Sequence, residues 1–334
     1  MTEPLLRLVD VSLSLPTRNG MQPILDRISF TVHRGEAFGL VGESGSGKSM
    51  TARSITRLLP PGALLTGDAS LAGRSTVTMS AKELRTVRSR QVQMIFQDPR
   101  AHIDPVRRMG DYLTEALVTN RGLARAEANR QVVDVLEAIG VTDARARLSQ
   151  YPHELSGGLL QRMMIAAAIV AEPELLIADE PTTALDVTTQ RGVVALLDAL
   201  RRERGLTLIF ITHDLDLAAA ICDRTAVMYA GSVVEVQDSG KLHTQPMHPY
   251  SAALVAARPA FTSGLRPLTI PGAPASLAEA GPGCQFMPRC PYKVKQCESH
   301  RPRLEKSGQG SVACFRSGEI RDDLAKIASR SSHG

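Results

Sequence analysis

A short glycine-rich segment constrains this chain more than any other part of its sequence. It reads GESGSGKS, from Gly42 to Ser49, and fits the pattern G-x-x-x-x-G-K-[ST]. An apolar run, Ala37 to Val41, precedes it and predicts a buried strand, and a helical pattern follows until Pro60. Glycines let such a loop turn its backbone N–H groups towards phosphate oxygens, and the helix start adds partial positive charge. The segment therefore predicts an α/β fold that binds nucleotide phosphates.

The residues of this loop have separate expected roles. Lys48 is expected to reach the β- and γ-phosphates, and the Ser49 hydroxyl to bind Mg²⁺. A phosphate loop alone does not distinguish a kinase, a GTPase, a motor and a transporter ATPase, so the other motifs decide the class. The loop residues expected to line the nucleotide are Gly42, Glu43, Ser44, Gly45, Ser46, Gly47, Lys48 and Ser49.

Two further apolar runs end in polar residues that suit phosphate chemistry. Leu175 to Ala178 predicts a buried parallel strand and is followed by Asp179 and Glu180. Asp179 is placed to hold the Mg²⁺ shell, and Glu180 to polarise a water aimed at the γ-phosphate. The run Leu206 to Thr212 ends at His213, a residue that can contact the γ-phosphate or have a structural role. Ligands bind at the carboxyl ends of such strands.

A second device for binding phosphate lies in the segment YPHELSGGLLQRMMIAAAIV. Ser156, Gly157 and Gly158 open an apolar helix predicted over residues 159–171, and a Ser-capped, glycine-rich helix start suits an anion. One ATP scarcely needs two such devices from the same chain, whereas a dimer with ATP between its partners uses both. An ordinary Ser-capped helix is the alternative interpretation of this segment.

The order of the motifs resembles the ATP-binding subunits of ABC transporters. The motifs are GESGSGKS, MIFQDP, LSGG, LLIADEP, ALD and ITHD, within residues 5 to about 240. The resemblance implies that Gly42 to Ser49 are the Walker A loop. It implies that Gln97 senses Mg²⁺ and contacts the membrane partner, and that Ser156, Gly157 and Gly158 close on the partner chain's ATP.

The same resemblance assigns the remaining motif residues. Asp179 and Glu180 would be the Walker B pair with Glu180 as general base, Asp186 the D-loop aspartate and His213 the switch histidine. Ser49, Gln97 and Asp179 would surround Mg²⁺, and Lys48 and Gln97 would assist hydrolysis. The sequence departs from the family pattern at two places. Leu159 replaces the usual glutamine of the signature, and Leu15 stands where an aromatic residue commonly stacks on adenine.

Strand and helix patterns divide the chain into four expected parts. Residues 1–97 and 172–245 are expected to form a RecA-like ATP-binding core with a parallel sheet and an N-terminal antiparallel part. Short strands are expected within residues 5–40, and two strands joined by a turn at Gly231 within residues 225–237. Residues 98–171 are expected to form an inserted helical subdomain with the signature. Prolines after residue 245 indicate an extended linker into a C-terminal extension, residues 246–318, with four cysteines. The polar tail, residues 319–334, is expected to be disordered.

The four cysteines of the extension are Cys284, Cys290, Cys297 and Cys314. A disulfide staple is one interpretation, but a reducing cytosol disfavours it. A four-thiolate metal site is another, and its spacing lacks the tight C-x₂₋₄-C pairs that structural zinc prefers, which favours iron–sulfur over zinc. Cys222 lies in an apolar stretch and is expected to be a core residue.

The C-terminal extension also resembles one branch of the ABC family. The segments HPYSAALVAARP, IPGAP and GCQFMPRCPY are similar to the extension found in the ATP-binding subunits of dipeptide, oligopeptide and nickel importers. In that branch four cysteines are associated with a [4Fe–4S] cluster. The resemblance therefore implies that all four cysteines are ligands of such a cluster, with zinc as the alternative metal.

These observations together predict an ATP-hydrolysing subunit of an importer for peptides or nickel. The expected partners are a second ATP-binding subunit, two membrane permeases and an extracytoplasmic solute-binding protein, at the cytoplasmic face of the membrane. No apolar run is long enough to span a bilayer. A soluble ABC ATPase acting on nucleic acid or ribosomes is the alternative. With aromatic residues at 4%, no long coiled coil and no tandem ATPase, the sequence disfavours a nucleic-acid partner.

Overall fold

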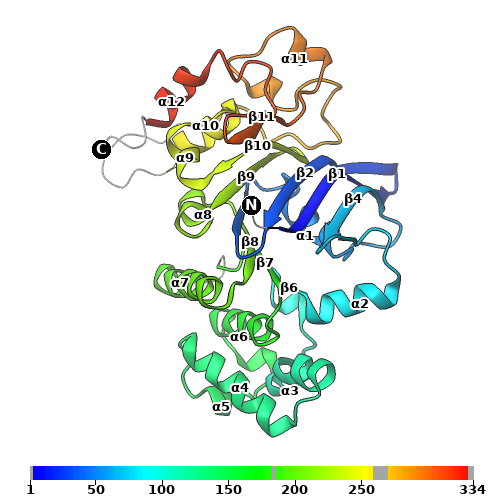
Figure 1. Ribbon diagram of the computed structural model, residues 1–334, viewed down its shortest axis with the longest axis vertical. Coiled ribbons are helices and arrows are strands. Elements are labelled where there is room, and N and C mark those ends of the chain that lie inside the picture. Colours follow the sequence, from blue (N-terminus) through cyan, green and yellow to red (C-terminus); the bar gives the residue numbers. More distant parts are fainter. Residues whose placement is uncertain (1–2, 183–185, 259–269, 330–334) are drawn as a thin grey trace. The chain divides into compact units, whose positions relative to one another are not determined.

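The computed structural model describes residues 3–182, 186–258 and 270–329 (Figure 1). The chain divides into two compact units. The first comprises Met1–His33, Ala37–Thr78 and Thr212–Gly334, and the second comprises Arg34–Glu36 and Met79–Ile211. No helix in the described ranges is long and apolar enough to cross a membrane.

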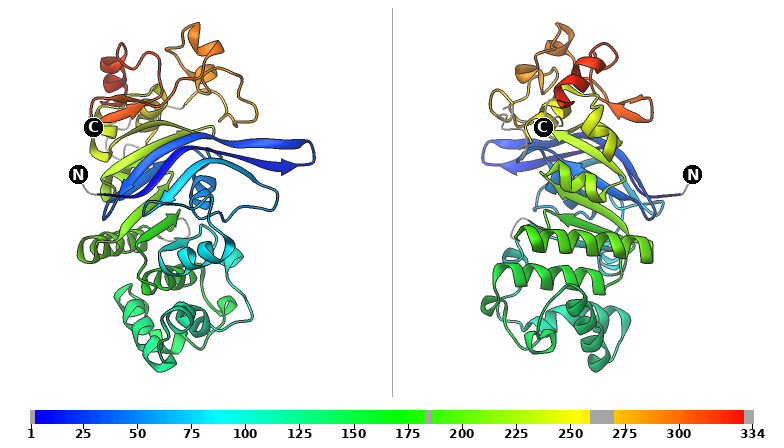
Figure 2. Two further views of the ribbon diagram at one scale, coloured as in Figure 1. Left: turned by 45° about the vertical axis from the view of Figure 1, so that its right-hand side comes forward. Right: turned by 90° about the vertical axis from the view of Figure 1, so that its left-hand side faces the viewer.

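An antiparallel sheet with the strand order β2-β1-β4-β5 forms one part of the first unit. Strands β1 (Pro4–Thr17) and β2 (Gly20–His33) make a long hairpin, seen as a twisted ribbon in Figure 2. Short strands were predicted here, but each strand has 14 residues. Shifts in register break the alternation of buried and exposed residues, so the period-2 pattern looks interrupted in the sequence. The sheet is completed by β4 (Leu64–Leu71) and β5 (Arg74–Ser75).

A second group of strands in the first unit is mixed rather than purely parallel. Strand β3 (Ala37–Val41) pairs in parallel with β9 (Arg224–Tyr229), and β9 pairs in antiparallel fashion with β10 (Ser232–Asp238) across the predicted turn at Gly231. The C-terminal extension adds two strands, because β12 (Gly310–Val312) pairs with β10 and β11 (Glu305–Ser307) pairs with β12. The fully buried β3 fits the apolar run seen in the sequence.

Helices of the first unit follow these strands. They are α1 (Lys48–Ile55), α8 (Leu215–Ile221), α9 (Ser239–Thr244), α10 (Pro249–Ala256), the 3₁₀ turn η4 (Met287–Arg289), α11 (Gln296–Ser299) and α12 (Arg321–Ser329). Helix α10 falls inside the segment expected to be an extended linker. Its residues Tyr250, Ala252 and Val255 are buried, which a solvated linker would not allow.

The second unit combines parallel strands with a helical part. Strands β6 (Val92–Ile95), β7 (Leu175–Asp179) and β8 (Thr207–Thr212) are adjacent and parallel. The predicted helical subdomain is present, and its helices pack around one apolar core that includes Leu113, Leu136 and Met163. The helical elements of the unit are α2 (Ala81–Arg90), η1 (Arg100–His102), α3 (Met109–Glu115), η2 (Ala116–Asn120), α4 (Arg125–Ala138), α5 (Ala144–Arg147), η3 (Pro152–Glu154), α6 (Gly157–Val170) and α7 (Val187–Arg204).

The expectation of a disordered tail from residue 319 is wrong for residues 321–329, which form helix α12. Ile320, Leu324 and Ala328 recur every fourth residue, and all three are buried. Ile320 and Leu324 pack in one cluster with Ala252 of α10. Most residues between these positions are polar, so the narrow apolar stripe is difficult to detect in the sequence. The helix is stabilised by the tertiary packing of this stripe.

A buried carboxyl group supports the start of α10. Glu235 on β10 is completely buried and accepts hydrogen bonds from the backbone N–H groups of Met247 (2.9 Å) and His248 (2.8 Å). Burial raises the pKa of Glu235 from 4.5 to about 7, although these hydrogen bonds act in the opposite direction. Burial also lowers the pKa of His248 to about 3, which keeps the imidazole neutral, and its Nδ1 accepts from the Tyr250 N–H.

The variant Leu324→Ala tests whether α12 is part of the folded unit. Leu324 is fully buried, so truncation should lower the free energy of unfolding by about 2–4 kcal/mol. Urea unfolding followed by circular dichroism measures this loss. The matched control is Lys326→Ala on the exposed side of the same helix, which should change stability by less than about 0.5 kcal/mol. Equal, negligible effects of both substitutions would mean that α12 does not pack.

The raised pKa of Glu235 makes a pH-dependent contribution to stability. Between pH 4.5 and about 7 the folded state keeps a proton that the unfolded state releases, so this contribution is lost as pH rises. Glutamine does not titrate, so a Glu235→Gln variant does not lose this contribution to stability as the pH rises. Its stability relative to the parent should therefore increase by about 1–3 kcal/mol between pH 4.5 and pH 7.5 in urea titrations. The His248 contribution is present in both proteins and cancels in the difference. A difference independent of pH would contradict the assignment.

Candidate nucleotide-binding site and cysteine cluster

The predicted phosphate loop leaves β3 at a point where no side chain fits. Gly42 has φ +155°, and a Cβ placed on it would lie 2.3 Å from the carbonyl oxygen of Met228 on β9. The loop ends at Gly47, which has φ +101° and precedes α1 without a side-chain cap. The first N–H groups of α1 therefore have no capping side chain, which is the arrangement that favours an anion.

The interior of the loop is organised around the Lys48 ammonium group. Lys48 is 6% exposed, and its Nζ donates to the carbonyl oxygens of Gly42 (2.8 Å) and Glu43 (3.0 Å). The Ser46 N–H donates to the Glu43 carbonyl oxygen (3.2 Å), and the Gly231 N–H donates to the Ser46 carbonyl oxygen (3.0 Å). The loop is thus a closed turn that holds a cation at its centre.

His213 also lies in the first unit, directly after β8. The Asp214 carboxylate caps α8 by accepting from the N–H groups of Asp216 and Leu217, and the Asp214 N–H donates to the Thr212 hydroxyl. These bonds fix the turn on both sides of His213, whose side chain is exposed. The turn therefore holds His213 at the C-terminal end of β8.

Three of the predicted residues lie at neighbouring strand ends in the second unit. Asp179 is the last residue of β7 and is 2% exposed. Glu180 follows with φ +46°, a backbone conformation that is uncommon outside glycine, and its N–H donates to Ile211 of β8. The Gln97 side-chain amide, after β6, donates to the Glu180 carboxylate at 3.0 Å. The structure therefore brings Gln97 and Glu180 together, and backbone strain at Glu180 is typical of functional sites.

The signature segment forms the predicted helix start in the second unit. Ser156 is the N-cap of α6, and its hydroxyl accepts from the Leu159 N–H at 3.3 Å. A Cβ added at Gly157 would meet no atom of the described chain within 4 Å, so the space beside this residue is open. The side chain of Leu159, which departs from the family pattern, packs against the apolar core of the helical subdomain. The substitution is compatible with the fold because Leu159 points into this core.

Asp186 is exposed and immediately precedes α7, where its carbonyl oxygen accepts from the Gln190 N–H at 2.8 Å. Ala184 and Leu185, the other two residues of the ALD motif, lie outside the described residues. The predicted role of this motif stays a prediction.

Sequence reasoning missed two groups of residues near these sites. Gln161 is 1% exposed in α6, and its amide donates to the carbonyl oxygen of Pro181, one residue after Glu180. The signal in the sequence that could have identified Gln161 is the presence of a glutamine in a mostly apolar helix. In the first unit, Tyr250 and Arg289 of the C-terminal extension both contact Glu43 of the phosphate loop. No local pattern links positions so distant in the sequence.

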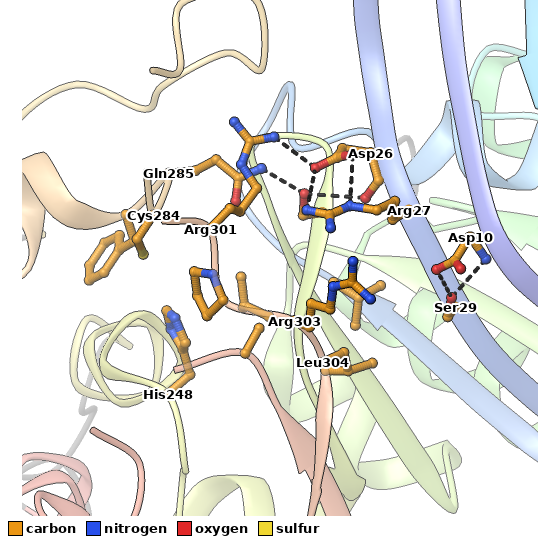
Figure 3. A pocket seen from close by; sticks show the side chains of 16 residues that line it. Asp10, Asp26, Arg27, Ser29, His248, Cys284, Gln285, Arg301, Arg303 and Leu304 are labelled. Atoms are coloured by element: carbon orange, nitrogen blue, oxygen red, sulfur yellow. Dashed lines mark hydrogen bonds and ion pairs between the residues drawn. The ribbon is translucent and has the colours of Figure 1, made fainter. Parts of the chain in front are cut away.

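The four cysteines of the extension line one small cavity of about 20 Å³ in the first unit. Cys284, Cys290, Cys297 and Cys314 are free thiols, so the structure gives no support to the disulfide interpretation. Cys222, which is also in no disulfide, is buried in the core as predicted. Cys284 additionally lines a larger neighbouring cavity of about 280 Å³, together with His248, Gln285 and Arg301 (Figure 3).

The structure does not support the expected metal module. The four thiols converge, but within the described residues no group of three or more His, Cys, Asp or Glu side chains is arranged to hold a metal ion. Burial raises the pKa of Cys284 and Cys290 to about 11, which favours their protonated forms. The cavity has room for about one water-sized particle. Ligation of a metal group would require these thiols to lose their protons.

The sequence around both sites matches two known protein-family models. A family model described as "ABC transporter" matches residues 25–183, and one described as "Oligopeptide/dipeptide transporter, C-terminal region" matches residues 234–297. The chain is 44% identical to the oligopeptide transport ATP-binding protein OppD of Salmonella typhimurium, over 93% of each chain. It is 38% identical to the dipeptide transport ATP-binding protein DppD of Bacillus subtilis, over 94% of this chain and 95% of the relative.

Solved structures show the same fold. A dimeric ATP-binding cassette in a post-hydrolysis state with ADP and phosphate has a TM-score of 0.65 and 25% identity, covering 70% of this chain and 98% of its own. CbiO1 of Clostridium perfringens, part of an ABC transporter complex, has a TM-score of 0.59 and 26% identity, with 72% and 90% covered. The chain is an ABC ATPase. Within that class, it belongs to the ATP-binding proteins of oligopeptide and dipeptide ABC transporters.

Proposed function

We propose that this chain drives the import of small peptides by binding and hydrolysing ATP between two ATPase subunits attached to membrane permeases. The observation that carries the proposal is the match of both the ABC region and the C-terminal region to the peptide transport branch, over nearly the whole chain. Relatives named as transport proteins favour this function over a soluble ATPase acting on nucleic acid or ribosomes. Nickel is the alternative solute.

The phosphate loop supplies the binding half of the proposed mechanism. ATP phosphates would occupy the loop, and the Lys48 ammonium would exchange the carbonyl oxygens of Gly42 and Glu43 for phosphate oxygens. The uncapped start of α1 adds N–H donors and partial positive charge. Mg²⁺ would be held by the Ser49 hydroxyl, the Asp179 carboxylate and the Gln97 side chain. All three side chains offer oxygen atoms, which are the ligands that Mg²⁺ prefers. The ion would neutralise charge on the transferred phosphoryl group.

The groups proposed for hydrolysis are Glu180 and Gln97 of the second unit and His213 of the first unit. Glu180 would accept a proton from the attacking water, and the Gln97 amide holds its carboxylate in one orientation. His213 would contact the γ-phosphate. Ser156 and the two glycines after it would bind the ATP of a partner subunit, because the open start of α6 offers N–H groups to an anion. Asp186 would line the contact between subunits. A second ATPase subunit, identical or related, therefore completes each site.

The four cysteines would hold a metal group in the same proposal. Their thiolates match the ligands of iron–sulfur clusters, and the spacing without tight pairs favours [4Fe–4S] over zinc. When bound, the group supplies the cross-link that a short extension cannot obtain from an apolar core of its own. Two permeases would receive the motion near Gln97, a solute-binding protein would deliver the peptide, and the chain would lie at the cytoplasmic face of the membrane.

The variant Glu180→Gln tests the proposed base. It should bind ATP with an affinity close to that of the parent, while the hydrolysis rate falls by roughly 100-fold or more because general-base assistance is lost. Phosphate release and ATP binding are measured side by side in the complex with permeases. The closed dimer should accumulate with ATP in size-exclusion chromatography. Undiminished turnover would exclude Glu180 as the base.

The metal proposal has an optical test. Protein purified without oxygen should be brown, with broad absorption near roughly 400 nm, and Cys290→Ser should lose much of this colour. Cys222→Ser, which alters a core cysteine outside the cluster, is the control and should keep it. If the protein is colourless and contains one equivalent of zinc, the bound metal is zinc and not iron, and the assignment of the four ligands stands. Protein without any metal would refute the site.

The transport proposal is tested in proteoliposomes that contain the chain, a second ATPase subunit and two membrane permeases. Addition of the peptide-loaded binding protein should stimulate ATP hydrolysis severalfold and move labelled peptide across the membrane. Labelled nickel serves as the competing solute. Stimulation by DNA or ribosomes, without any response to the binding protein, would favour the soluble alternative.

A further inference from the structure

A buried arginine of the cysteine-rich extension is paired with the phosphate loop. The Arg289 guanidinium donates from Nη1 to Oε2 of Glu43 (2.8 Å) and from Nη2 to Oε1 (3.2 Å), which is a two-pronged ion pair. The Arg289 side chain is 5% exposed and the Glu43 side chain 22%. Both residues belong to the first unit. A buried guanidinium without a carboxylate is strongly unfavourable, so each group holds the other in place.

The surroundings of Arg289 leave it little freedom. Its Nε donates to the carbonyl oxygen of Pro271 (2.8 Å), and Nη2 also donates to that of Ile270 (3.3 Å). The guanidinium carbon lies 5.8 Å from the ring centre of Tyr229 and 6.0 Å from that of Phe286. Cation–π attraction and directed hydrogen bonds therefore fix the plane of the guanidinium. This rigidity is what a residue needs in order to position another.

The position of Glu43 affects the groups that are expected to bind phosphate, because its backbone contacts them. Its carbonyl oxygen accepts from the Lys48 ammonium (3.0 Å) and from the Ser46 N–H (3.2 Å). Its own N–H donates to the Tyr250 hydroxyl at 2.9 Å. A displaced Glu43 would therefore move a carbonyl that shapes the loop around Lys48. The side chain of Glu43 acts on the nucleotide through its backbone.

The position of Arg289 is in turn set by two of the cysteines. Arg289 ends the turn η4 and directly precedes Cys290, whose N–H donates to the Met287 carbonyl oxygen (3.2 Å). The Met287 N–H donates to the carbonyl oxygen of Cys284 (3.0 Å). Residues 284–290 are thus a single compact turn with a cysteine at each end, and Arg289 projects from it.

We propose that Arg289 is a positioning residue for the phosphate loop, and that it couples the ligation state of the four cysteines to the affinity for ATP. Ligation of Cys284 and Cys290 fixes both ends of the turn and thereby the Arg289–Glu43 pair. Loss of the metal group frees the turn, and the pair and the loop lose their alignment. The inference rests on the proposed function, in that residues 42–49 bind ATP and the cysteines hold a metal group.

A double-mutant cycle tests the positioning role in the full chain. Arg289→Met and Glu43→Gln should each raise the Kd for ATP about tenfold, measured by equilibrium dialysis, and the double variant should be no worse than either single one. In hydrolysis assays the KM for ATP should rise with the change in Kd, while kcat stays within about threefold. Glu43→Gln conserves size, so the Kd of this single variant still tests the pair if Arg289→Met folds poorly.

A comparable ion pair provides the matched control. Arg301, also in the extension, pairs with Asp26 of the N-terminal hairpin at 2.7 Å, as Figure 3 shows, and it is 19% exposed. It contacts no residue of the phosphate loop in the described chain. Arg301→Met should therefore leave the Kd for ATP within about twofold. If it weakens ATP binding as much as Arg289→Met, or if the Arg289 and Glu43 effects multiply, the positioning role is refuted.

Metal depletion tests the coupling. The parent protein, stripped by a chelator under reducing conditions, should bind ATP about tenfold more weakly, and depleted Arg289→Met should bind no more weakly than undepleted Arg289→Met. An equal loss in both backgrounds, or no loss in the parent, would refute coupling through Arg289. Failure of the undepleted parent to bind ATP would instead contradict the proposed function. Absence of any metal would contradict the metal site, and the double-mutant cycle would still report on Arg289 and Glu43.

Discussion

A phosphate-binding loop made of backbone N–H groups has to be held in shape by groups outside itself. If the loop satisfied its own donors, none would remain for phosphate. In this chain the support comes from separate segments of the first unit. Gly42 passes against the Met228 carbonyl, Gly231 bonds to Ser46, and Tyr250 and Arg289 hold Glu43. The C-terminal extension is therefore part of the loop's support.

The strongest predictions from sequence concerned short segments whose chemistry is local. The strand, glycine loop and helix around Gly42–Ser49 could be predicted because each step depends on neighbouring residues. The same holds for the Ser156 cap of α6 and for the turn at Gly231. Asp179 and Glu180 were also placed correctly at the end of a buried strand. Their roles in catalysis are part of the proposed function.

Features that depend on distant parts of the chain escaped prediction. Helix α12 owes its order to packing of Leu324 against the first unit, and its own sequence is mostly polar. The 14-residue strands were read as shorter because register shifts disrupt their alternation. The Glu43–Arg289 pair joins positions 246 residues apart. Tertiary contact decides each of these features, and periodicity within a window cannot reveal it.

The hairpin of β11 and β12 has a consequence for the evolution of the fold. β12 pairs with the outer side of β10 at Glu235 and Val236, so the extension protects a strand that would otherwise offer unpaired backbone groups to other chains. A cassette shortened before residue 305 would leave this edge of β10 unpaired and would also lose Cys314. The extension is thus difficult to lose in one step, because its removal would carry an immediate penalty in solubility.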